Sequence, residues 1–476
     1  MLFNSWQFGV FLPVVFLIYW NLPKKFSNKK WIFLLLASYY FYMSWEVKYV
    51  VLILFTTLIS YFAAIFLEKT QNKTAKKLIL ISALVSCLGV LFVFKYFNFF
   101  SENFACFMSL FAIKLHPVTL KLILPVGISF YTFQTLSYVI DVYRGDIKPE
   151  KNFGIYAAFI SFFPQLVAGP IERTKNLLPQ IKSPHEFNYE QASYGLKLMA
   201  WGFFKKLCIA DTIAVYVDKV FGMLIRYEGF SLILAVFFFT IQIYCDFSGY
   251  SDIARGAAKL FGIELMENFK SPYFSSSIKE FWSRWHISLS TWFRDYVYIP
   301  LGGSRVSKFR HAVNLMITFL ISGLWHGANW NFLIWGGVHG LAQVIENFAL
   351  KKRTKNFFRM ILTFIFCMLA WTFFRAENFS EVIYIFSNMF KINGGLIKYF
   401  HDGFQIIGMG KFPLALTCLT LLILALYDYF SLDRDVIKKI SSKNKFIRWS
   451  IYIALGLYIA FFSPKGVVTE FVYFQF

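Results

Sequence analysis

The chain has 476 residues, of which 58% are hydrophobic and 16% charged, whereas about 25% of a typical soluble domain is charged. Aromatic residues alone make up 21% of the chain. This composition excludes a disordered or fibrous protein and disfavours a soluble enzyme, because a soluble surface needs more charge. It is typical of a protein that crosses a membrane several times.

The formal net charge of +22 would also suit a nucleic-acid-binding protein. The basic residues, however, fall in short runs between apolar segments, as they do in the cytoplasmic loops of membrane proteins. The sequence contains neither an arginine-rich helix nor a zinc-finger spacing. We therefore expect a membrane-lipid environment and no nucleic-acid partner.

Apolar segments occur along the whole chain, and each is a candidate membrane helix. A bilayer core about 30 Å thick needs roughly 20 apolar residues per helix, and the segments that reach or approach this length predict about 11 to 13 membrane helices. No separate soluble domain is evident, so we expect one all-α integral-membrane domain over residues 1–476. In chain order, the predicted spans are 7–22, 31–44, 47–67, 78–100, 119–141, 153–169, 194–225, 230–246, 312–325, 329–349, 357–375, 412–430 and 447–463.

Lysine and arginine runs predict the orientation of these spans. Basic runs are typical of cytoplasmic loops, and at each end of the chain two spans separate one run from the next, so all of these runs can lie in the cytoplasm. One further span at each end then places both chain termini on the outer side. The first span lacks a basic leader and a small-residue cleavage site, so it is predicted to be retained. The basic runs lie at 24–30, 69–77, 305–310, 351–353 and 438–445.

Ionisable residues within apolar stretches mark candidate functional sites, because charge is costly in lipid. Four places qualify, at 246–252, 279–296, 323–331 and 337–340. His326 is the most informative, because it lies roughly 21 Å along a predicted helix. Gly323 and Gly327 flank it and permit a kink or a close backbone approach. A neutral histidine there can act as a general base for a hydroxyl, or it can hydrogen-bond between helices.

Two further segments carry histidines. If one continuous helix carried both His326 and His339, they would lie about 20 Å apart on different faces. We therefore expect a packing or tautomer-fixing role for His339. The segment 279–296 interleaves aromatic and charged residues, which is typical of an interfacial helix. Its functional interpretation is a helix beside a polar tunnel, with His286 presented to the tunnel.

Other chemistries lack their motifs. The sequence contains no HExxH, no Cys/His quartet, no GxSxG elbow, no P-loop and no GxGxxG. We therefore expect neither a metal site nor a bound cofactor. No internal repeat is evident, which disfavours an inverted-repeat transporter. The residues alone leave open an enzyme, a proton-coupled transporter and a lipid-handling scaffold.

Several stretches resemble the signature of the membrane-bound O-acyltransferases, in the bacterial branch that acylates cell-envelope polymers. The longest, at 246–305, reads DFSGYSDIARGAAKLFGIELMENFKSPYFSSSIKEFWSRWHISLSTWFRDYVYIPLGGSR. The others are LPVGISFYTFQTLSYVIDVYRG at 124–145, FFPQLVAGPIERTKNLLPQ at 162–180, ISGLWHGANWNFLIWGGVHG at 321–340 and FFRAENFSEV at 373–382. With the opening MLFNSWQFGVFLP, the resemblance covers nearly the whole chain, and its core lies at about 124–340.

The resemblance implies an all-helical fold around a narrow central tunnel, open to the acyl donor from the cytoplasm and widening into an outer funnel. The histidine of the WHG motif, His326, is then the catalytic residue. The histidine of the RWH motif, His286, is the second functional position. Neighbours expected to shape the tunnel and bind substrate are Asn329, Arg284, Asp246, Asp295 and Trp325.

The same resemblance implies an O-acetyltransferase of the bacterial inner membrane that uses acetyl-CoA as acyl donor. A periplasmic or membrane-anchored partner transferase is expected to pass the acetyl group to the polymer. Peptidoglycan is the expected acceptor, because its O-acetylation is widespread. Alginate O-acetylation, D-alanyl transfer to teichoic acid and a non-catalytic transporter coupled to acetyl or proton movement are the alternatives.

Overall fold

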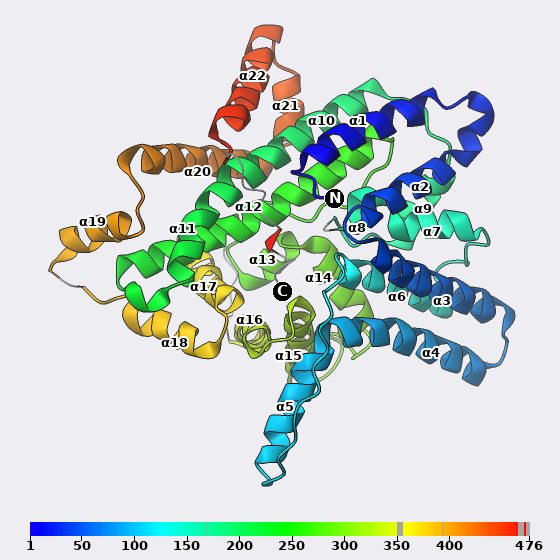
Figure 1. The fold of residues 1–476 in the computed structure, drawn as a ribbon, viewed down its shortest axis with the longest axis horizontal. Helices are drawn as coiled ribbons and strands as arrows, with labels where there is room; N and C mark the ends of the chain where they lie inside the picture. The colour runs from blue at the N-terminus through cyan, green and yellow to red at the C-terminus, as the bar shows by residue number, and fades with distance from the viewer. Residues whose placement is uncertain (168, 350–355, 393, 465–470, 473–476) are drawn as a thin grey trace. The chain divides into compact units, whose positions relative to one another are not determined.

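The computed structural model describes residues 1–167, 169–349, 356–392, 394–464 and 471–472. These residues form helices and no strand (Figure 1), which confirms the predicted all-α class. The chain divides into two compact units. The N-terminal unit comprises Met1–Leu196 and Ala254–Met266, and the C-terminal unit comprises Lys197–Ile253 and Glu267–Phe476. The basic run predicted at 351–353 lies outside the described residues.

Six helical segments of the described chain are long and apolar enough to cross a membrane. This confirms a multi-pass membrane protein, whereas the larger count of about 11 to 13 helices stays a prediction. Several other predicted spans are helical but shorter or more polar. The six segments are Val47–Lys69, Lys73–Ser109, Phe230–Leu260, Phe357–Arg375, Lys411–Ser431 and Lys445–Phe462.

The N-terminal unit is a set of helices, and the non-helical segment 110–127 joins two of them. Its elements are α1 (Trp6–Asn21), η1 (Lys24–Lys29), α2 (Lys30–Met43), η2 (Val47–Tyr49), α3 (Val50–Lys69), α4 (Lys73–Leu91), η3 (Phe92–Tyr96), α5 (Phe97–Ser109), α6 (Ile128–Arg144), α7 (Phe153–Ser161), α8 (Phe163–Leu166) and α9 (Thr174–Lys182). Two helices, α10 (Tyr189–Phe203) and α12 (Phe230–Leu260), include residues of both units.

The C-terminal unit contains the WHG and RWH motifs, which carry His326 and His286. Its remaining elements are η4 (Phe204–Ala210), α11 (Asp211–Phe221), η5 (Leu224–Arg226), η6 (Pro272–Phe274), α13 (Ile278–Arg284), α14 (Ile287–Phe293), η7 (Arg294–Tyr298), α15 (Lys308–His326), α16 (Trp330–Phe348), α17 (Phe357–Arg375), α18 (Phe379–Asn388), α19 (Leu396–Ile406), α20 (Lys411–Ser431), α21 (Val436–Ser441) and α22 (Lys445–Phe462).

Two predicted elements differ from the structure. The span predicted at 230–246 ended too early, because α12 continues through the polar stretch 246–252 to Leu260. A Cβ on Gly249 would lie 2.8 Å from the backbone oxygen of Gly202 in α10. The two glycines therefore let α12 pack closely against α10 at this polar stretch. The segment 279–296 is not one interfacial helix. It forms α13, α14 and η7, and its tryptophans Trp282, Trp285 and Trp292 are buried.

The helices α15 and α16 form a hairpin in which glycines bring the two backbones together. A Cβ on Gly323 would lie 2.2 Å from the backbone oxygen of Phe332, and a Cβ on Gly336 would lie 2.3 Å from that of Phe319. Only glycine allows this approach, because any Cβ would collide with the facing backbone. The hairpin also changes the geometry assumed for His339, because α15 ends at His326 and no continuous helix carries both histidines.

Buried ion pairs join η4 and α11 to α12. The ammonium of Lys206 lies 2.6 Å from the Asp246 carboxylate and 2.8 Å from the Asp211 carboxylate. Lys205 makes the equivalent contact with Asp252 at 2.7 Å. Charges buried in this way need such partners, because each one alone would be strongly disfavoured in an apolar environment.

The C-terminal segment Phe471–Val472 lies against the same part of α12. The Val472 N–H donates to the Asp246 carboxylate at 2.7 Å. The Phe471 ring lies 5.0 Å from the Tyr250 ring and 5.5 Å from the Phe247 ring, and it is buried. Asp246 therefore connects η4, α12 and the end of the chain.

The hairpin can be tested with two neighbouring glycines. We expect Gly336→Ala to lower the melting temperature of the purified protein in detergent, because the new methyl group meets the backbone of α15. In Gly337→Ala the nearest atom is a side-chain carbon of Leu320 at 3.7 Å, an ordinary contact. That control should match or slightly exceed the wild type, because alanine favours a helix by about 1 kcal/mol over glycine. Equal melting temperatures for both variants would contradict the close packing.

The buried ion pair provides a second test. We expect Asp246→Asn to lower the free energy of unfolding by about 3 kcal/mol, because Lys206 loses one of its two buried carboxylate partners. Unfolding in mixed micelles of increasing denaturing detergent measures this change. The control Asp295→Asn alters a carboxylate beside exposed Arg294 and should cost less than about 1 kcal/mol. A smaller loss for Asp246→Asn than for Asp295→Asn would rule out a stabilising role for this pair.

Candidate active site

His326 is the last residue of α15 and lies within a cluster of aromatic side chains. Its ring centroid is 5.1 Å from that of Trp335, 5.2 Å from that of Phe374 and 5.0 Å from that of Trp325. The histidine is only 3% exposed. The following residue, Gly327, has extended backbone that ends the helix, and a Cβ there would collide with the Phe332 ring at 2.2 Å. Tight packing therefore fixes the position of the imidazole.

His286 lies at a backbone corner between α13 and α14. Its φ of +42° is unusual for a residue with a side chain, and such strain persists only where the surroundings impose it. The neighbouring segment imposes it here: the Ile287 N–H donates to the Asn268 carbonyl at 3.0 Å, and the Ser288 N–H donates to the Asn268 side chain at 3.3 Å.

The surroundings of His286 are apolar. The imidazole is fully buried and meets the Phe247 ring edge-to-face at 4.5 Å. Burial lowers the pKa of His286 to about 3, because the charged form loses its water. His286 is therefore neutral near pH 7.

Trp325 separates the two predicted histidines and contacts both. Its ring centroid lies 6.0 Å from that of His286 and 5.0 Å from that of His326. The structure thus brings His286, Trp325 and His326 together in the core of the C-terminal unit, although 40 positions separate the two histidines (326 − 286 = 40).

His339 belongs to the same cluster. Its ring centroid lies 4.9 Å from that of Trp335, which also packs against His326. The Trp282 indole N–H donates to His339 Nδ1 at 3.3 Å, so this nitrogen accepts and the imidazole tautomer is set. A packing and tautomer role for His339 remains the prediction, and Trp282 is the partner that the structure adds to it.

The other predicted site residues lie around this cluster with partners of their own. Asn329 caps α16 by accepting from the Asn331 N–H at 2.9 Å, and its amide donates to the Glu377 carbonyl. Arg284 pairs with Glu280 at 2.8 Å, and Asp295 pairs with Arg294 at 2.8 Å. Asp246 accepts from Val472 and pairs with Lys206, as described above. Whether any of them shapes a tunnel stays a prediction.

Sequence reasoning missed several residues of this region. Lys205 and Lys206 lie inside the predicted span 194–225, and Asp428 lies inside 412–430, so the search for charges in apolar stretches contained the signal for them. The aromatic residues around His326 gave no such signal, because one aromatic in five residues makes each one unremarkable. Those that the structure places there are Trp335, Trp371 and Phe374.

His286, Trp325, His326, Trp335 and His339 together form what we call the histidine cluster. A cavity of about 530 Å³ lies beside it, among α13, α14, η7, α15 and α16. We call it the polar cavity, because hydroxyl and amide groups such as Ser290, Thr318 and Gln343 line it together with the cationic Lys279 and Arg294. Trp282, which bonds to His339, forms part of its wall. Polar groups of this kind orient a ligand within a largely apolar pocket.

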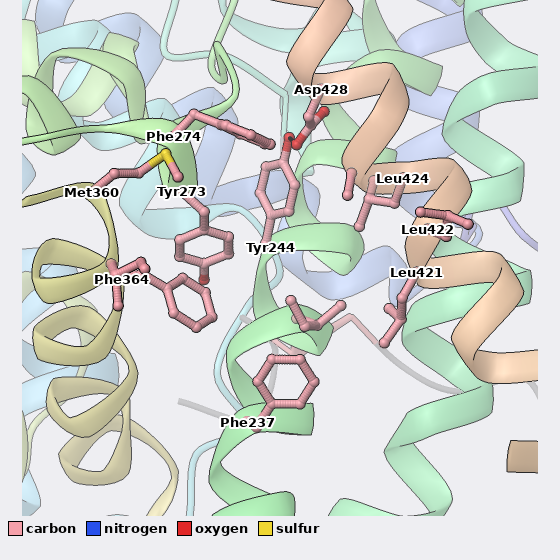
Figure 2. Close-up of a pocket in the computed structure, with 13 residues that line it drawn as sticks. Phe237, Tyr244, Tyr273, Phe274, Met360, Phe364, Leu421, Leu422, Leu424 and Asp428 are labelled. Carbon is pink, nitrogen blue, oxygen red and sulfur yellow. Dashed lines mark hydrogen bonds between the residues drawn. The ribbon is translucent and has the colours of Figure 1, made fainter. Parts of the chain in front are cut away.

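A second cavity, of about 470 Å³, lies among α12, η6, α17 and α20 (Figure 2). Its lining is almost entirely apolar. Its polar groups include the Tyr244 hydroxyl, which donates to the Asp428 carboxylate at 2.7 Å, and the Tyr273 hydroxyl, which donates to the Thr240 carbonyl at 2.6 Å. Tyr273 links this apolar cavity to the aromatic rings around His326. Its ring lies 6.0 Å from that of Trp285, which packs on Trp371 at 4.9 Å, and Trp371 packs on Trp335 at 5.5 Å.

The arrangement suits proton transfer in a dry environment. A buried neutral imidazole can accept a proton from a hydroxyl, and aromatic walls exclude the water that would hydrolyse a reactive ester. Among the residues that the structure describes, no group of three or more histidine, cysteine or acidic side chains is arranged to hold a metal ion.

Comparison with known proteins shows to which family the chain belongs. The sequence model of the MBOAT, membrane-bound O-acyltransferase family matches residues 152–379, which include His286, His326 and His339. A probable alginate O-acetylase AlgI of Pseudomonas putida is 38% identical over 436 residues, covering 90% of this chain and 88% of that protein. A peptidoglycan O-acetyltransferase of Helicobacter pylori is 38% identical over 432 residues, covering 83% of this chain and 80% of that protein.

A more distant relative matches part of the chain. A teichoic acid D-alanyltransferase of Streptococcus thermophilus is 30% identical over 271 residues, covering 54% of this chain and 65% of that protein. Together with the multi-pass helical fold and the buried histidine cluster, these similarities establish that the chain belongs to the membrane-bound O-acyltransferase family and is a membrane-bound acyltransferase.

Proposed function

We propose that this acyltransferase takes an acetyl group from cytoplasmic acetyl-CoA and passes it across the inner membrane for O-acetylation of peptidoglycan, through a periplasmic partner transferase. The observation that supports this most is the position of His326. It is buried among aromatic rings and lies one helical turn from Ser322, which lines the polar cavity. A base in that position can meet a thioester from one side and a hydroxyl from the other.

The reaction follows from acid–base chemistry at one imidazole. His326 takes the proton of the acceptor hydroxyl as its oxygen attacks the thioester carbonyl, forming a tetrahedral intermediate. The carbon–sulfur bond then breaks, and the imidazolium returns the proton to the departing sulfur. The products are the acetyl ester of the acceptor and free CoA thiol, so no cofactor is consumed.

The polymer that finally receives the acetyl group from the partner transferase has two candidates. The relative from Helicobacter pylori is named for peptidoglycan, and several Pseudomonas relatives are named for alginate, at closely similar identities. We propose peptidoglycan because its O-acetylation is the more widespread modification, with alginate as the second candidate. Ester-linked acetate released by mild base from purified peptidoglycan and from exopolysaccharide, in cells with and without this chain, separates the two.

Replacing His326 tests the catalytic role. We expect His326→Gln to lower thiol release from acetyl-CoA at least about 100-fold, because the general base is lost. Purified protein is assayed in detergent, alone and with its candidate periplasmic partner. The control His401→Gln changes an exposed histidine and should retain the wild-type rate. Thiol release at the wild-type rate by a folded His326→Gln protein would show that this residue is not the general base.

A transporter makes a different prediction. It would carry acetate across the membrane of wild-type proteoliposomes without releasing thiol.

The low pKa of His286 makes a separate prediction. Because burial lowers its pKa to about 3, His286 does not titrate between about pH 5 and 8, the range in which an ordinary histidine changes charge. We expect His286→Gln to reduce the rate of acetyl transfer without moving the acid limb of its pH profile. A shift of that limb by more than about half a pH unit would show that His286 carries the titrating proton.

A further inference from the structure

We propose that the apolar cavity among α12, η6, α17 and α20 binds a neutral lipid of the cytoplasmic leaflet, with a hydrocarbon chain in the cavity and a hydroxyl group at Asp428. This site is separate from the polar cavity and from the histidine cluster, and it does not depend on the proposed function. Three features of the cavity support it: an opening towards lipid, one polar end, and an orientation that matches the inner leaflet.

The cavity opens between α17 and α20. Ile361 of α17, and Leu422 and Ala425 of α20, line it and are exposed at the surface of the C-terminal unit. Both helices are long and apolar enough to cross a membrane, so we expect the surface around this opening to face hydrocarbon. A cavity of about 470 Å³ with an apolar lining admits a hydrocarbon chain and offers water few partners.

One polar group of this cavity is available to a ligand. The Tyr244 hydroxyl donates to Oδ2 of Asp428 at 2.7 Å. The Tyr273 hydroxyl donates to the Thr240 carbonyl at 2.6 Å, so both tyrosine hydroxyls have acceptors. Oδ1 of Asp428, by contrast, accepts no hydrogen bond from the residues that the structure describes. Because a carboxylate can accept about four hydrogen bonds and this side chain is only 6% exposed, a donor on a ligand would lower the cost of its burial.

A hydroxyl group suits this position better than a phospholipid headgroup does. It donates to an ionised carboxylate and accepts from a protonated one, so either state of Asp428 can bind it. A phosphate would lie against the carboxylate in an apolar environment, where like charges repel strongly. An ammonium headgroup of a phospholipid brings the same phosphate with it. The ligand that fits is therefore a neutral amphiphile with a hydroxyl group.

The cavity has the orientation of a lipid in the inner leaflet. Figure 2 shows Asp428 and Met360 towards one end of it and Phe237 towards the other. Met360 lies in the first turn of α17, which follows the basic run 351–353, and Asp428 lies in the last turn of α20, which precedes the run 438–445. The sequence predicts that both runs are cytoplasmic. The polar end of the cavity then lies towards the cytoplasm and the apolar end towards the membrane centre.

Two kinds of lipid share this chemistry: diacylglycerol, and a long-chain alcohol with a single chain. The probe is a long-chain alcohol with a photoactivatable diazirine near the end of its chain. It is added to phosphatidylcholine nanodiscs that contain the purified protein, because phosphatidylcholine supplies hydrocarbon chains but no hydrogen-bond donor. The competitors, at equal mole fraction, are octadecanol, dioleoylglycerol and octadecane, which lacks the hydroxyl. Mass spectrometry locates the labelled residues.

A larger side chain in the cavity tests where the chain binds. We expect the probe to label the cavity-lining residues of α17 and α20, and this labelling to fall about 10-fold or more in Ala425→Phe, because the new ring fills space that the chain needs. The matched control Ala415→Phe makes the same change at another exposed alanine of α20, which does not line the cavity, and should keep wild-type labelling. Melting temperatures of both variants verify folding.

The competitors test the hydroxyl contact. We expect octadecanol or dioleoylglycerol to compete with the probe about 10-fold better than octadecane, because a hydrogen bond to a charged group adds to the affinity. In Asp428→Leu, which removes the carboxylate and keeps a side chain of similar size, octadecanol and octadecane should compete equally. The comparison of ligands in the wild-type chain tests the contact even if this variant fails to fold.

Each outcome decides for or against the site. Equal competition by octadecanol and octadecane in the wild type overturns it, and so does an equal loss of labelling in the two alanine variants. Labelling of α22, which has no buried residue, as strongly as the cavity would show general contact with lipid and would also overturn the site. Competition by dioleoylglycerol supports the site and identifies diacylglycerol as a ligand, whereas competition by octadecanol alone supports it with a single-chain alcohol. Thiol release from acetyl-CoA enters none of these results, so the site and the proposed function can fail separately.

Discussion

The close approach of α15 and α16 at Gly323 and Gly336 determines where His326 lies relative to α16. Without side chains between them, the two backbones meet, and His326 at the end of α15 comes to lie against Trp335 of α16. Trp335 in turn contacts His339, which accepts a hydrogen bond from Trp282. The contact of His326 with Trp335 therefore depends on a close backbone approach that only glycine allows.

Polar groups in a membrane protein need partners within the protein, because lipid offers none. The C-terminal unit meets this requirement with ion pairs. Lys206 lies between Asp211 and Asp246, and Asp246 also accepts from the backbone of Val472. The same contacts hold α12 beside η4, which places Phe247 against His286. Electrostatic pairing near the middle of α12 thus supports a histidine that itself carries no charge.

The two cavities of the C-terminal unit differ in chemistry, and the aromatic cluster contacts both. The polar cavity has cations and hydroxyl groups, whereas the apolar cavity is lined mainly by hydrocarbon side chains, with the pair of Tyr244 and Asp428 among them. Trp282 lines the first and Tyr273 lines the second, and both rings pack on the aromatic cluster near His326.

The sequence by itself determined the features that depend on local composition. Hydropathy predicted the span 357–375, and α17 covers those residues. The cost of a charge in lipid singled out His326, and the motif resemblance indicated the family. Local patterns predict these features because hydropathy and helix length need no knowledge of distant residues.

Tertiary structure decided what depends on contacts between distant residues. The continuation of α12 through Asp246 depends on Lys206, Asp211 and the end of the chain, none of which neighbours it in sequence. The contact of His286 with Trp325, and the bond from Trp282 to His339, arise because α13, α15 and α16 pack together. A linear pattern carries no information about such pairings, because they form only when side chains from separate helices fill the same space.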